Sequence, residues 1–356
     1  MKPKKIKIAL LFGGSSAEHE VSLVSATSIY KNLDKKKYEV VSIYINKEGY
    51  WRIVESPLLP QSSLKQGNFF FFLPWREKTI VQDIYADIYF PVLHGPCGED
   101  GTIQGLFEMA DVPYIGAAVL ASAIAMDKAM AKILFKLKNL PVVKHFILFE
   151  SDWEREQERY LSKIKKGFCL PFFVKPANLG SSVGITKVKD YANSEAALEE
   201  AFKYDRKILV EEGILGRELE CSVLGNENPK VSLPGELIPF REFYDYKDKY
   251  VEDKTSFVIP AELPSSIVKE IQRISLEAYK AINCSGMARV DFFLEEKTEK
   301  IILNEINTIP GFTEISMYPK LWEVSGLPFP ALLDTLIELG FERHQKKKRT
   351  WKKFIL

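Results

Sequence analysis

The stretch "LPFFVKPANLGSSVGITKV", Leu170 to Val188, decides the fold. It opens with an apolar run typical of a buried strand, carries Lys175 near the end of that run, and continues through a glycine-serine loop into β-branched residues. Glycine lets backbone N–H groups approach an anion closely, and lysine supplies a compact positive charge, so the pattern indicates phosphate. The chain has no G-x-x-x-x-G-K-[ST] motif, however, and this loop leads into a second strand rather than a helix. A nucleotide bound here would therefore be held in some other way than by a P-loop.

The overall composition limits the function classes. The chain has 356 residues, long enough for two or three domains, and its formal net charge of +1 comes from interspersed basic and acidic residues. This balance disfavours nucleic acid and anionic membranes as partners, and we interpret the basic segment 343–354 as a solvated terminus. Four cysteines lie far apart without a C-x-x-C spacing, which favours reduced thiols and a cytoplasmic location. No segment approaches the roughly 20 apolar residues of a membrane span.

Strand and helix signals alternate at the start of the chain. Apolar runs typical of strands occupy 5–12, 38–45 and 86–93, and apolar residues at helical spacing occupy 20–33. Strands separated by helices predict a parallel sheet covered by helices. Residues 51–78 contain prolines, polar clusters and an aromatic run, and we interpret them as an insertion at the sheet edge.

The pattern changes to shorter strands and longer loops near residue 125. The apolar pattern of the segment 118–141, which spans this point, predicts one helix that ends at Pro141. Further strands are expected at "ELECSVLG", "GMARVDFFL" and "KIILNEIN". We therefore predict a mixed α/β and α+β fold in three domains, 1–125, 126–213 and 214–356.

The strongest chemical signal lies in "MARVDFFLEEKTEKIILNEINTIPGF", residues 287–312. Side chains two apart in a strand share a face, so Arg289 points the same way as Asp291, and Glu305 the same way as Asn307. The polar turn between these strands predicts an antiparallel pair whose polar faces coincide. Buried carboxylates need a counter-charge, and oxygen ligands favour Mg²⁺ or Mn²⁺ beside substrate phosphates. The alternative is a hairpin whose polar face is merely exposed to solvent.

Gly311 follows the second of these strands in "TIPGF". Its backbone N–H, together with the planar cation of Arg289 on the same sheet, resembles an anion hole for charge that develops at a carbonyl or phosphoryl oxygen. A Pro-Gly pair alone is equally well explained as a turn.

Two further groups of residues suit a nucleotide. Glu211 and Glu212 end an apolar strand, with Ile214 just beyond, where an adenine could be bound between domains, and Glu218 offers a carboxylate for the ribose. Lys128 is a second candidate phosphate ligand, although a lysine on a helix is ordinarily exposed. Any strand end can carry glutamates, so this pattern is not specific.

The N-terminal loops offer a site for a small ligand. In "FGGSSAEHEVS" a glycine turn leads into a helix, with Ser15 or Ser16 as its cap. Beyond this capping role, a helix N-terminus after the first strand of a parallel sheet suits anionic or zwitterionic ligands, and Glu18 could receive an ammonium group. His94 lies in a second such turn, "LHGPCGEDG", where a structural role is the alternative.

Taken in order, these motifs resemble the D-alanine–D-alanine ligases of the ATP-grasp superfamily. The resemblance covers nearly the whole chain, through "LFGGSSAEHEVS", "HGPCGEDGTIQGLFE", "MDK", "VKPANLGSSVGI", "FYDYKDKY", "ARVDFF" and "NEINTIPGFTEISMYP". It implies an ATP-grasp fold with an N-terminal parallel-sheet (preATP-grasp) domain. The nucleotide would be gripped between two sheets, with the glycine-serine loop as a lid over the phosphates.

The resemblance also implies the reaction. ATP would phosphorylate the carboxylate of one D-alanine, and the amine of a second D-alanine would attack the acyl phosphate. The products would be the dipeptide, ADP and phosphate, for peptidoglycan precursor synthesis. ATP, two Mg²⁺ (or Mn²⁺) ions and a homodimeric assembly are implied in the same way.

Carried over position by position, the resemblance implies a role for each candidate residue. The phosphate ligands would be Lys128 and Lys175, and the lid residues Ser181 and Ser182. The adenosine pocket would comprise Glu211, Glu212, Ile214 and Glu218. The metal ligands would be Asp291, Glu305 and Asn307. Arg289 and Gly311 would stabilise the oxyanion. The first D-alanine would be met by Glu18 and His94, and the second by Ser316 and Met317. The loop that closes over the site would carry Lys249 and Tyr250, with Tyr250 hydrogen-bonded toward Glu18 and Ser181.

Two other readings remain open at this point. A D-alanine–D-lactate or D-alanine–D-serine ligase is the alternative within the superfamily. Tyr250 argues against it, because such enzymes tend to lack or replace that tyrosine. A binding protein that kept the fold but lost catalysis is disfavoured by the complete set of metal ligands and Arg289. Separately, Glu212 stands where many relatives have lysine and Glu314 lies beside the expected acceptor pocket, and these two departures concern nucleotide affinity and acceptor preference in detail.

Overall fold

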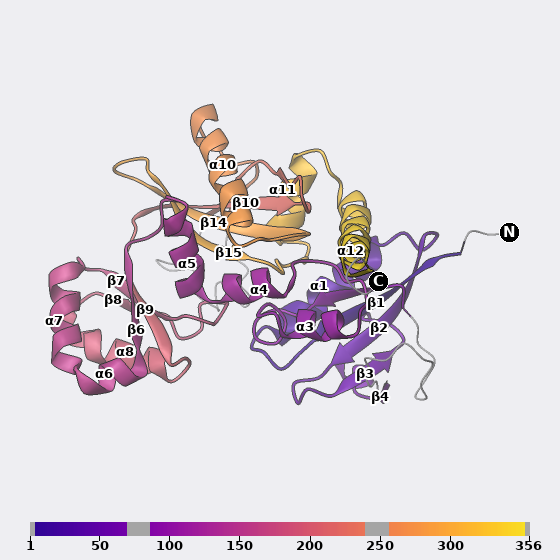
Figure 1. The fold of residues 1–356 in the computed structure, drawn as a ribbon, viewed down its shortest axis with the longest axis horizontal. Helices are drawn as coiled ribbons and strands as arrows, with labels where there is room; N and C mark the ends of the chain where they lie inside the picture. Colours follow the sequence, from indigo (N-terminus) through magenta and orange to yellow (C-terminus); the bar gives the residue numbers. More distant parts are fainter. Residues whose placement is uncertain (1–3, 70–85, 239–255, 353–356) are drawn as a thin grey trace.

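The computed structural model of the chain describes residues 4–69, 86–238 and 256–352. Its strands form three sheets, and each sheet lies in a different part of the molecule (Figure 1). The expected α/β and α+β architecture is confirmed, because a partly parallel N-terminal sheet is followed by two antiparallel ones.

The N-terminal sheet has the strand order β4-β3-β2-β1-β5. Its strands are β1 (Ile6–Gly13), β2 (Tyr38–Ile45), β3 (Trp51–Val54), β4 (Asn68–Phe69) and β5 (Ile88–Val92). The predicted parallel pairing is confirmed, because β1 runs parallel to both β2 and β5. The expected helix is α1 (His19–Asn32), which connects β1 to β2. Within the segment interpreted as an insertion, β3 and β4 extend the sheet as antiparallel strands around the short α2 (Gln61–Leu64), and 70–78 lies outside the described residues.

The four-stranded sheet has the order β6-β9-β7-β8 and carries the opening motif. Its strands are β6 (His145–Phe149), β7 (Phe172–Pro176), β8 (Thr186–Val188) and β9 (Lys207–Glu212). The helical segments beside it are α6 (Glu150–Arg155), α7 (Gln157–Gly167), η1 (Tyr191–Asn193) and α8 (Ser194–Phe202). Apolar side chains from these helices and strands share one core. The predicted strand, loop and second strand of 170–188 are confirmed, because β7 and β8 pair antiparallel around the glycine-serine loop.

The larger antiparallel sheet has the order β13-β12-β10-β14-β15, with β11 paired to β10. Its strands are β10 (Gly216–Leu224), β11 (Lys230–Val231), β12 (Gly235–Ile238), β13 (Ser256–Val258), β14 (Met287–Glu295) and β15 (Ile301–Asn307). The helix α10 (Ser265–Ala281) contributes Ile271, Ile274 and Ala278 to its core.

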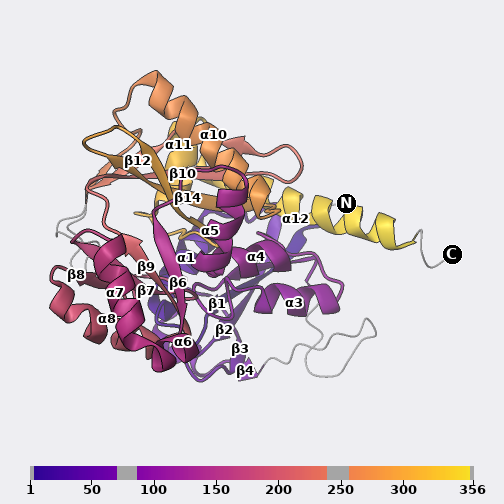
Figure 2. The same ribbon diagram turned by 60° about the vertical axis from the view of Figure 1, so that its left-hand side comes forward.

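The single helix predicted for 118–141 is wrong. Two helices, α4 (Val119–Met126) and α5 (Lys128–Leu137), meet at Asp127, whose backbone is extended. The Asp127 carboxylate accepts hydrogen bonds from the backbone of Ala129 and Met130, both at 3.1 Å, and so caps α5. In both views α4 lies between α3 (Thr102–Met109) and α5 (Figure 1, Figure 2). The break therefore starts a new helix with Lys128 as its first residue.

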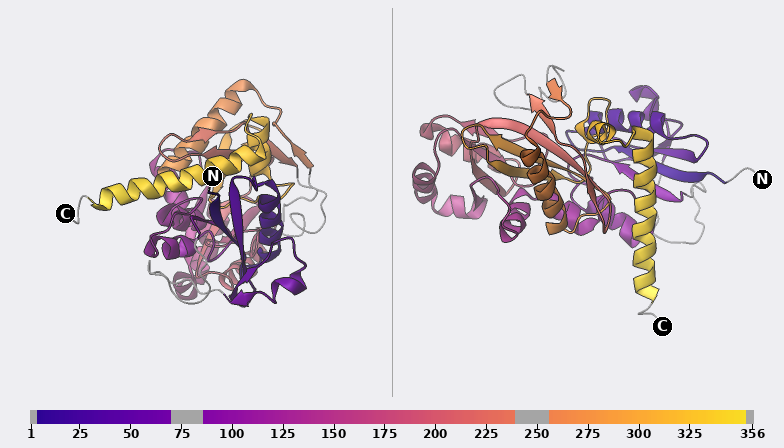
Figure 3. Two further views of the ribbon diagram at one scale, coloured as in Figure 1. Left: turned by 90° about the vertical axis from the view of Figure 1, so that its right-hand side faces the viewer. Right: turned by 90° about the horizontal axis from the view of Figure 1, so that it is seen from above.

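The two C-terminal helices contribute apolar side chains to the core of the N-terminal sheet. The shorter is α11 (Met317–Val324), and the longer, α12 (Phe329–Lys352), ends away from the rest of the molecule (Figure 3). Leu332, Leu333 and Leu336 of α12 belong to the same apolar core as Leu10 of β1. The C-terminal helix is therefore part of the core of the N-terminal sheet. The domain boundaries expected near residues 125 and 213 stay a prediction.

The described part of the chain contains no single helix with the length and apolar character of a membrane span. Only α11 and the first part of α12 pass such a test together, as a pair bent by 106°. Several of their apolar side chains lie in the core shared with the N-terminal sheet.

Candidate active site

A cavity of about 1280 Å³ is lined by residues from the two antiparallel sheets, from α1 and from loops next to the N-terminal sheet. Every candidate residue within the described ranges lines it, and they lie on distant segments of the sequence: Glu18, His94, Lys128, Lys175, Ser181, Ser182, Glu211, Glu212, Ile214, Glu218, Arg289, Asp291, Glu305, Asn307, Gly311, Ser316 and Met317. Lys249 and Tyr250 lie outside the described residues. The fold therefore gathers candidates from both ends of the chain and from its middle around one space.

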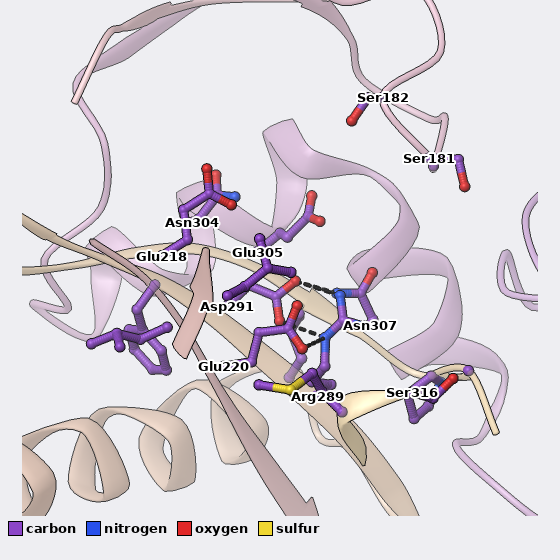
Figure 4. A pocket seen from close by; sticks show the side chains of 18 of the residues that line it. Ser181, Ser182, Glu218, Glu220, Arg289, Asp291, Asn304, Glu305, Asn307 and Ser316 are labelled. Carbon is purple, nitrogen blue, oxygen red and sulfur yellow. Dashed lines mark hydrogen bonds and ion pairs between the residues drawn. The ribbon is translucent and has the colours of Figure 1, made fainter. Parts of the chain in front are cut away.

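The predicted hairpin of β14 and β15 is confirmed as an antiparallel pair with the expected face. Asp291 lies opposite Glu305, and the pairing of the two strands shifts directly after this position. Arg289 lies opposite Asn307, whose side-chain amide donates a 2.9 Å hydrogen bond to Asp291 (Figure 4). Arg289 donates two further hydrogen bonds to the Asp291 carboxylate, both 2.7 Å long. The two strands thus present carboxylate, amide and guanidinium groups on one side.

Glu220 on β10 is a second carboxylate partner of Arg289 that the sequence reasoning missed. It lies opposite Asp291 in the pairing of β10 with β14, and its Oε2 is 3.1 Å from Arg289 Nε. Burial lowers the pKa of Arg289, but the Asp291 and Glu220 carboxylates outweigh this and raise it well above its usual range. Glu220 shares a strand face with Glu218, and this two-residue spacing was the available signal.

The described residues contain no group of three His, Cys, Asp or Glu side chains able to hold a metal ion. The set on this hairpin is smaller, with the carboxylates of Asp291 and Glu305 and the amide oxygen of Asn307. Hard oxygen donors of this kind suit Mg²⁺, which keeps several waters and takes further ligands from phosphate groups. The residues present therefore fit an ion that is shared between protein and nucleotide.

Two lysines face the cavity from the four-stranded sheet and its neighbouring helix. Lys128, at the start of α5, donates a 2.5 Å hydrogen bond from Nζ to the Leu179 carbonyl of the glycine-serine loop. The same ammonium group lies 3.8 Å from the Glu305 carboxylate. Lys175, near the end of β7, forms an ion pair with Glu211 on the adjacent β9. Both cations therefore lie beside carboxylates at the edge of the pocket.

Glu211 also pairs with Lys132, another residue that the sequence reasoning missed. Lys132 Nζ lies 3.1 Å from Glu211 Oε1 and donates a 2.9 Å hydrogen bond to the Asn304 carbonyl. Burial lowers the pKa of Lys132 to about 8. Burial alone would raise the pKa of Glu211, but the ammonium groups of Lys132 and Lys175 lower it to about 2. The signal in the sequence was the spacing of Lys132 four residues after Lys128, on the same side of a helix.

The glycine-serine loop reaches the N-terminal part of the molecule. Ser181 Oγ donates a hydrogen bond to the Glu18 carboxylate, and both Ser181 and Ser182 have positive φ angles of 51° and 59°. Figure 4 shows these two serines across the pocket from the cluster around Arg289. Gly184 has a φ of 72°, and a Cβ there would lie 2.8 Å from Pro176 and Tyr204 atoms, so only glycine fits this bend.

The expected serine cap of α1 is wrong. The helix begins at His19 with Glu18 as its N-cap residue, and no side chain caps it. Ser16 Oγ accepts a 3.2 Å hydrogen bond from the Glu18 backbone and donates one of 2.7 Å to the His94 carbonyl. The serine therefore ties the loop of Glu18 to the loop of His94.

His94 is buried and Glu99 is half-buried near Glu18. His94 Nδ1 lies 3.0 Å from the Ile309 carbonyl, and burial lowers its pKa although the Glu18 charge opposes this. Glu99, which the sequence reasoning missed, accepts hydrogen bonds from the backbone of Gly95 and Ile309. Burial, reinforced by the Glu18 charge, raises the pKa of Glu99 to about 8. The site therefore combines a charged carboxylate with one that stays largely protonated near neutral pH.

The segment after β15 forms the remaining wall. Ser316 Oγ accepts a 2.9 Å hydrogen bond from the Thr313 backbone. A Cβ on Gly311 would lie 2.7 Å from that Oγ, so a larger residue at this position would displace the serine hydroxyl. Met317 begins α11 and is buried. The turn in this segment lies at Thr313–Ser316, where the Ser316 N–H donates a 3.0 Å hydrogen bond to the Thr313 carbonyl, and not at the Pro310–Gly311 pair.

Comparisons with known proteins agree with this geometry. The family model "D-ala D-ala ligase N-terminus" matches residues 7–117, and "D-ala D-ala ligase C-terminus" matches residues 134–338. The D-alanine–D-alanine ligase of Caldicellulosiruptor bescii is 48% identical over 355 residues, which covers 97% of this chain and 97% of that protein. The solved D-alanine–D-alanine ligase of Coxiella burnetii is 39% identical with a TM-score of 0.83, covering 98% of this chain and 99% of the other. The VanG D-Ala:D-Ser ligase of Enterococcus faecalis is 36% identical with a TM-score of 0.84, covering 95% of this chain and all (100%) of the other. The chain therefore belongs to the D-alanine–D-alanine ligase family.

Proposed function

We propose that this protein joins two D-alanines to D-alanyl-D-alanine and converts ATP to ADP and phosphate. The observation that carries the proposal is the single cavity whose walls combine two lysines, the β14–β15 carboxylates, Arg289 and the Glu18–Ser181 contact. A carboxylate oxygen of the first D-alanine attacks the γ-phosphorus, and ADP leaves. The amine of the second attacks the acyl carbon and loses a proton, and phosphate leaves.

The nucleotide is bound between the four-stranded sheet and the larger antiparallel sheet. Lys128 and Lys175 hold its phosphates as cations, and Ser181 and Ser182 close over them from the loop. The adenosine pocket comprises Glu211, Glu212, Ile214 and Glu218. The support for this arrangement is that both lysines face the cavity from elements next to the loop.

Asp291, Glu305 and Asn307 hold the Mg²⁺ ions, or Mn²⁺ in their place. When bound, such ions neutralise the charge of the transferring phosphoryl group and orient it. In the described structure the Asp291 carboxylate is paired with Arg289, so binding of the ions requires this carboxylate to be shared. All three side chains offer oxygen donors on one face of the hairpin.

The remaining candidates act on the two amino acids. Arg289 and the Gly311 N–H stabilise negative charge on the reacting oxygens. Glu18 receives the ammonium group of the first D-alanine beside His94, and Ser316 and Met317 contact the second. Lys249 and Tyr250 close the site in the prediction from sequence, which stays a prediction because both lie outside the described residues.

The choice of acceptor needs its own support, because the fold is shared with a D-Ala:D-Ser ligase at a TM-score of 0.84. The relative that is 48% identical over nearly its whole length is named for D-alanine as acceptor, which favours the dipeptide. Homodimeric assembly and a cytoplasmic location stay predictions from the sequence.

Product analysis tests the proposal. The protein is incubated with ATP, Mg²⁺ and D-alanine alone, or with D-alanine and an excess of D-serine or D-lactate, and the products are resolved by mass spectrometry. We expect D-alanyl-D-alanine as the main product and release of phosphate only when D-alanine is present. If the main product contained D-serine or D-lactate, that compound would be the acceptor instead of D-alanine. If phosphate were released equally with and without D-alanine, ligation would be excluded.

A further inference from the structure

Lys132 is a buried lysine for which the proposed function has no role. Its side chain is 1% exposed, and it lies on a face of α5 that otherwise buries Ala129, Ala131 and Phe135. An apolar side chain of similar length would fill this position without the cost of burying a charge. Packing alone therefore does not explain a lysine here.

The ammonium group of Lys132 connects the two parts of the nucleotide site. It lies 3.1 Å from Glu211 Oε1, while the other oxygen of the same carboxylate is paired with Lys175. It also donates a 2.9 Å hydrogen bond to the carbonyl of Asn304, the residue before Glu305. One carboxylate is thus shared by two cations, and the same lysine is anchored to the strand that carries a metal ligand.

We propose that Lys132 is a positioning residue that shares the charge of Glu211 and thereby keeps the positive charge of Lys175 available to nucleotide phosphates. This inference rests on the proposed binding of ATP at this site. With Lys132 present, the cluster of Lys132, Glu211 and Lys175 carries a net charge of +1. Without it, Glu211 neutralises Lys175 completely, and the net charge of the cluster falls to zero. Because the cluster is largely shielded from solvent, this loss of charge strongly weakens the attraction for a polyphosphate bound next to it.

Nucleotide binding by charge variants tests the proposal. The affinities of ATP and of adenosine are measured by isothermal titration calorimetry at fixed Mg²⁺ concentration. Adenosine lacks phosphates, so the ratio of the two affinities reports on phosphate binding alone. We expect Lys132→Met to weaken ATP at least tenfold while adenosine changes less than about threefold. Equal losses for both ligands would mean that Lys132 only supports the fold of the site, and would overturn the proposal.

Variants of Glu211 separate the charge from the packing. In Lys132→Met/Glu211→Gln the cluster returns to +1, and we expect the ATP-to-adenosine ratio to return to within about threefold of the unmodified protein. Glu211→Gln alone removes the carboxylate that helps to keep the buried Lys132 ammonium charged, but Lys175 still gives the cluster a charge of at least +1, so its ratio should not fall below that of the unmodified protein. A ratio that does not follow the order of net charge would overturn the proposal. These two variants test it even where Lys132→Met fails to fold, because neither leaves Glu211 without its second cation.

Lys136→Met is the matched control. Lys136 lies one helical turn after Lys132 on α5, and its side chain is exposed beside His145, at 3.5 Å from Nε2. The Lys136→Met substitution removes one positive charge from the same helix but outside the cluster, so the affinities for ATP and for adenosine should both stay unchanged. Failure of the proposed function would appear differently, as ATP binding by the unmodified protein without formation of D-alanyl-D-alanine.

Discussion

The β14–β15 hairpin and the glycine-serine loop face one another across the pocket, but they are held in different ways (Figure 4). The hairpin fixes its polar groups through paired strands, and Arg289 and Asn307 both donate to Asp291. The loop connects β7 to β8 with left-handed backbone at Ser181 and Ser182, and Ser181 contacts Glu18 on a distant part of the chain. Rigid strands suit groups that must keep their geometry throughout a reaction, and a loop suits a cover that must open and close.

The largest expected effect comes from the rigid side. Glu305→Ala should lower turnover at least about a thousandfold, because it removes one of two carboxylates that fit a metal ion beside the phosphates. The melting temperature should change by only a few degrees, since Glu305 is not part of the apolar core. Initial rates of phosphate release and a thermal melt measure both. Glu296→Ala, at an exposed position in the turn of the same hairpin, is the control. An active Glu305→Ala protein would remove the metal assignment and the contrast built on it.

A smaller effect is expected on the side of the glycine-serine loop. Ser181→Ala removes the hydrogen bond to the Glu18 carboxylate, and hydrogen bonds to charged groups contribute about 1.5–3 kcal/mol. We therefore expect kcat/KM for D-alanine to fall about 10- to 100-fold while the melting temperature stays the same. Steady-state kinetics measure the loss, with Ser162→Ala on the exposed side of α7 as control. Unchanged kinetics would mean that the contact between loop and N-terminal domain is incidental.

Glu99 sharpens the comparison because it joins the N-terminal loop to the segment after β15, through Gly95 and Ile309. Its pKa is raised from 4.5 to about 8 by burial and by the Glu18 charge. Between these values the folded protein holds a proton that the unfolded chain has lost, so this group's contribution to stability falls as pH rises. The slope is about 1.4 kcal/mol per pH unit.

Glu99→Gln should remove this pH dependence. The melting temperature of Glu99→Gln minus that of the unmodified protein should be more positive at pH 7.5 than at pH 5.5. The reason is that glutamine has no proton to lose as the pH rises. Differential scanning calorimetry at the two pH values measures the difference. Glu296→Gln should show no such change between them. If the two proteins melt with the same pH dependence, Glu99 is not a protonated carboxyl in the folded state.

The smallest expected effect is a change in backbone protection. Amides of residues 178–184 should exchange severalfold more slowly with ATP and Mg²⁺ than without, because a closed loop is held over the phosphates. Amides of β14 and β15 should exchange at the same rate in both conditions. Hydrogen-exchange mass spectrometry compares the two segments in one experiment. Equal protection of the loop with and without nucleotide would contradict its role as a lid.

Reasoning from the sequence succeeded where one element decides the outcome. The two-residue period of strands was enough to place Asp291 and Glu305 on a common face, and the pairing of β14 with β15 bears this out. It failed at Asp127, where a continuous helical pattern hid a cap that ends α4 and begins α5. Apolar periodicity continues through such a break, because both helices bury a face against neighbouring elements, so composition alone does not reveal it.

The sequence by itself determined which side chains each strand and turn can offer: the lysine at the end of β7, the carboxylates of the hairpin and the glycines of the two loops. Tertiary structure alone decided their partners. Lys132 meets Glu211, Glu220 meets Arg289 and Glu99 lies beside Glu18, each across a large separation in the chain. The reason is physical, because periodicity sets the direction of a side chain relative to its own backbone, whereas its charge partner depends on which other element packs opposite.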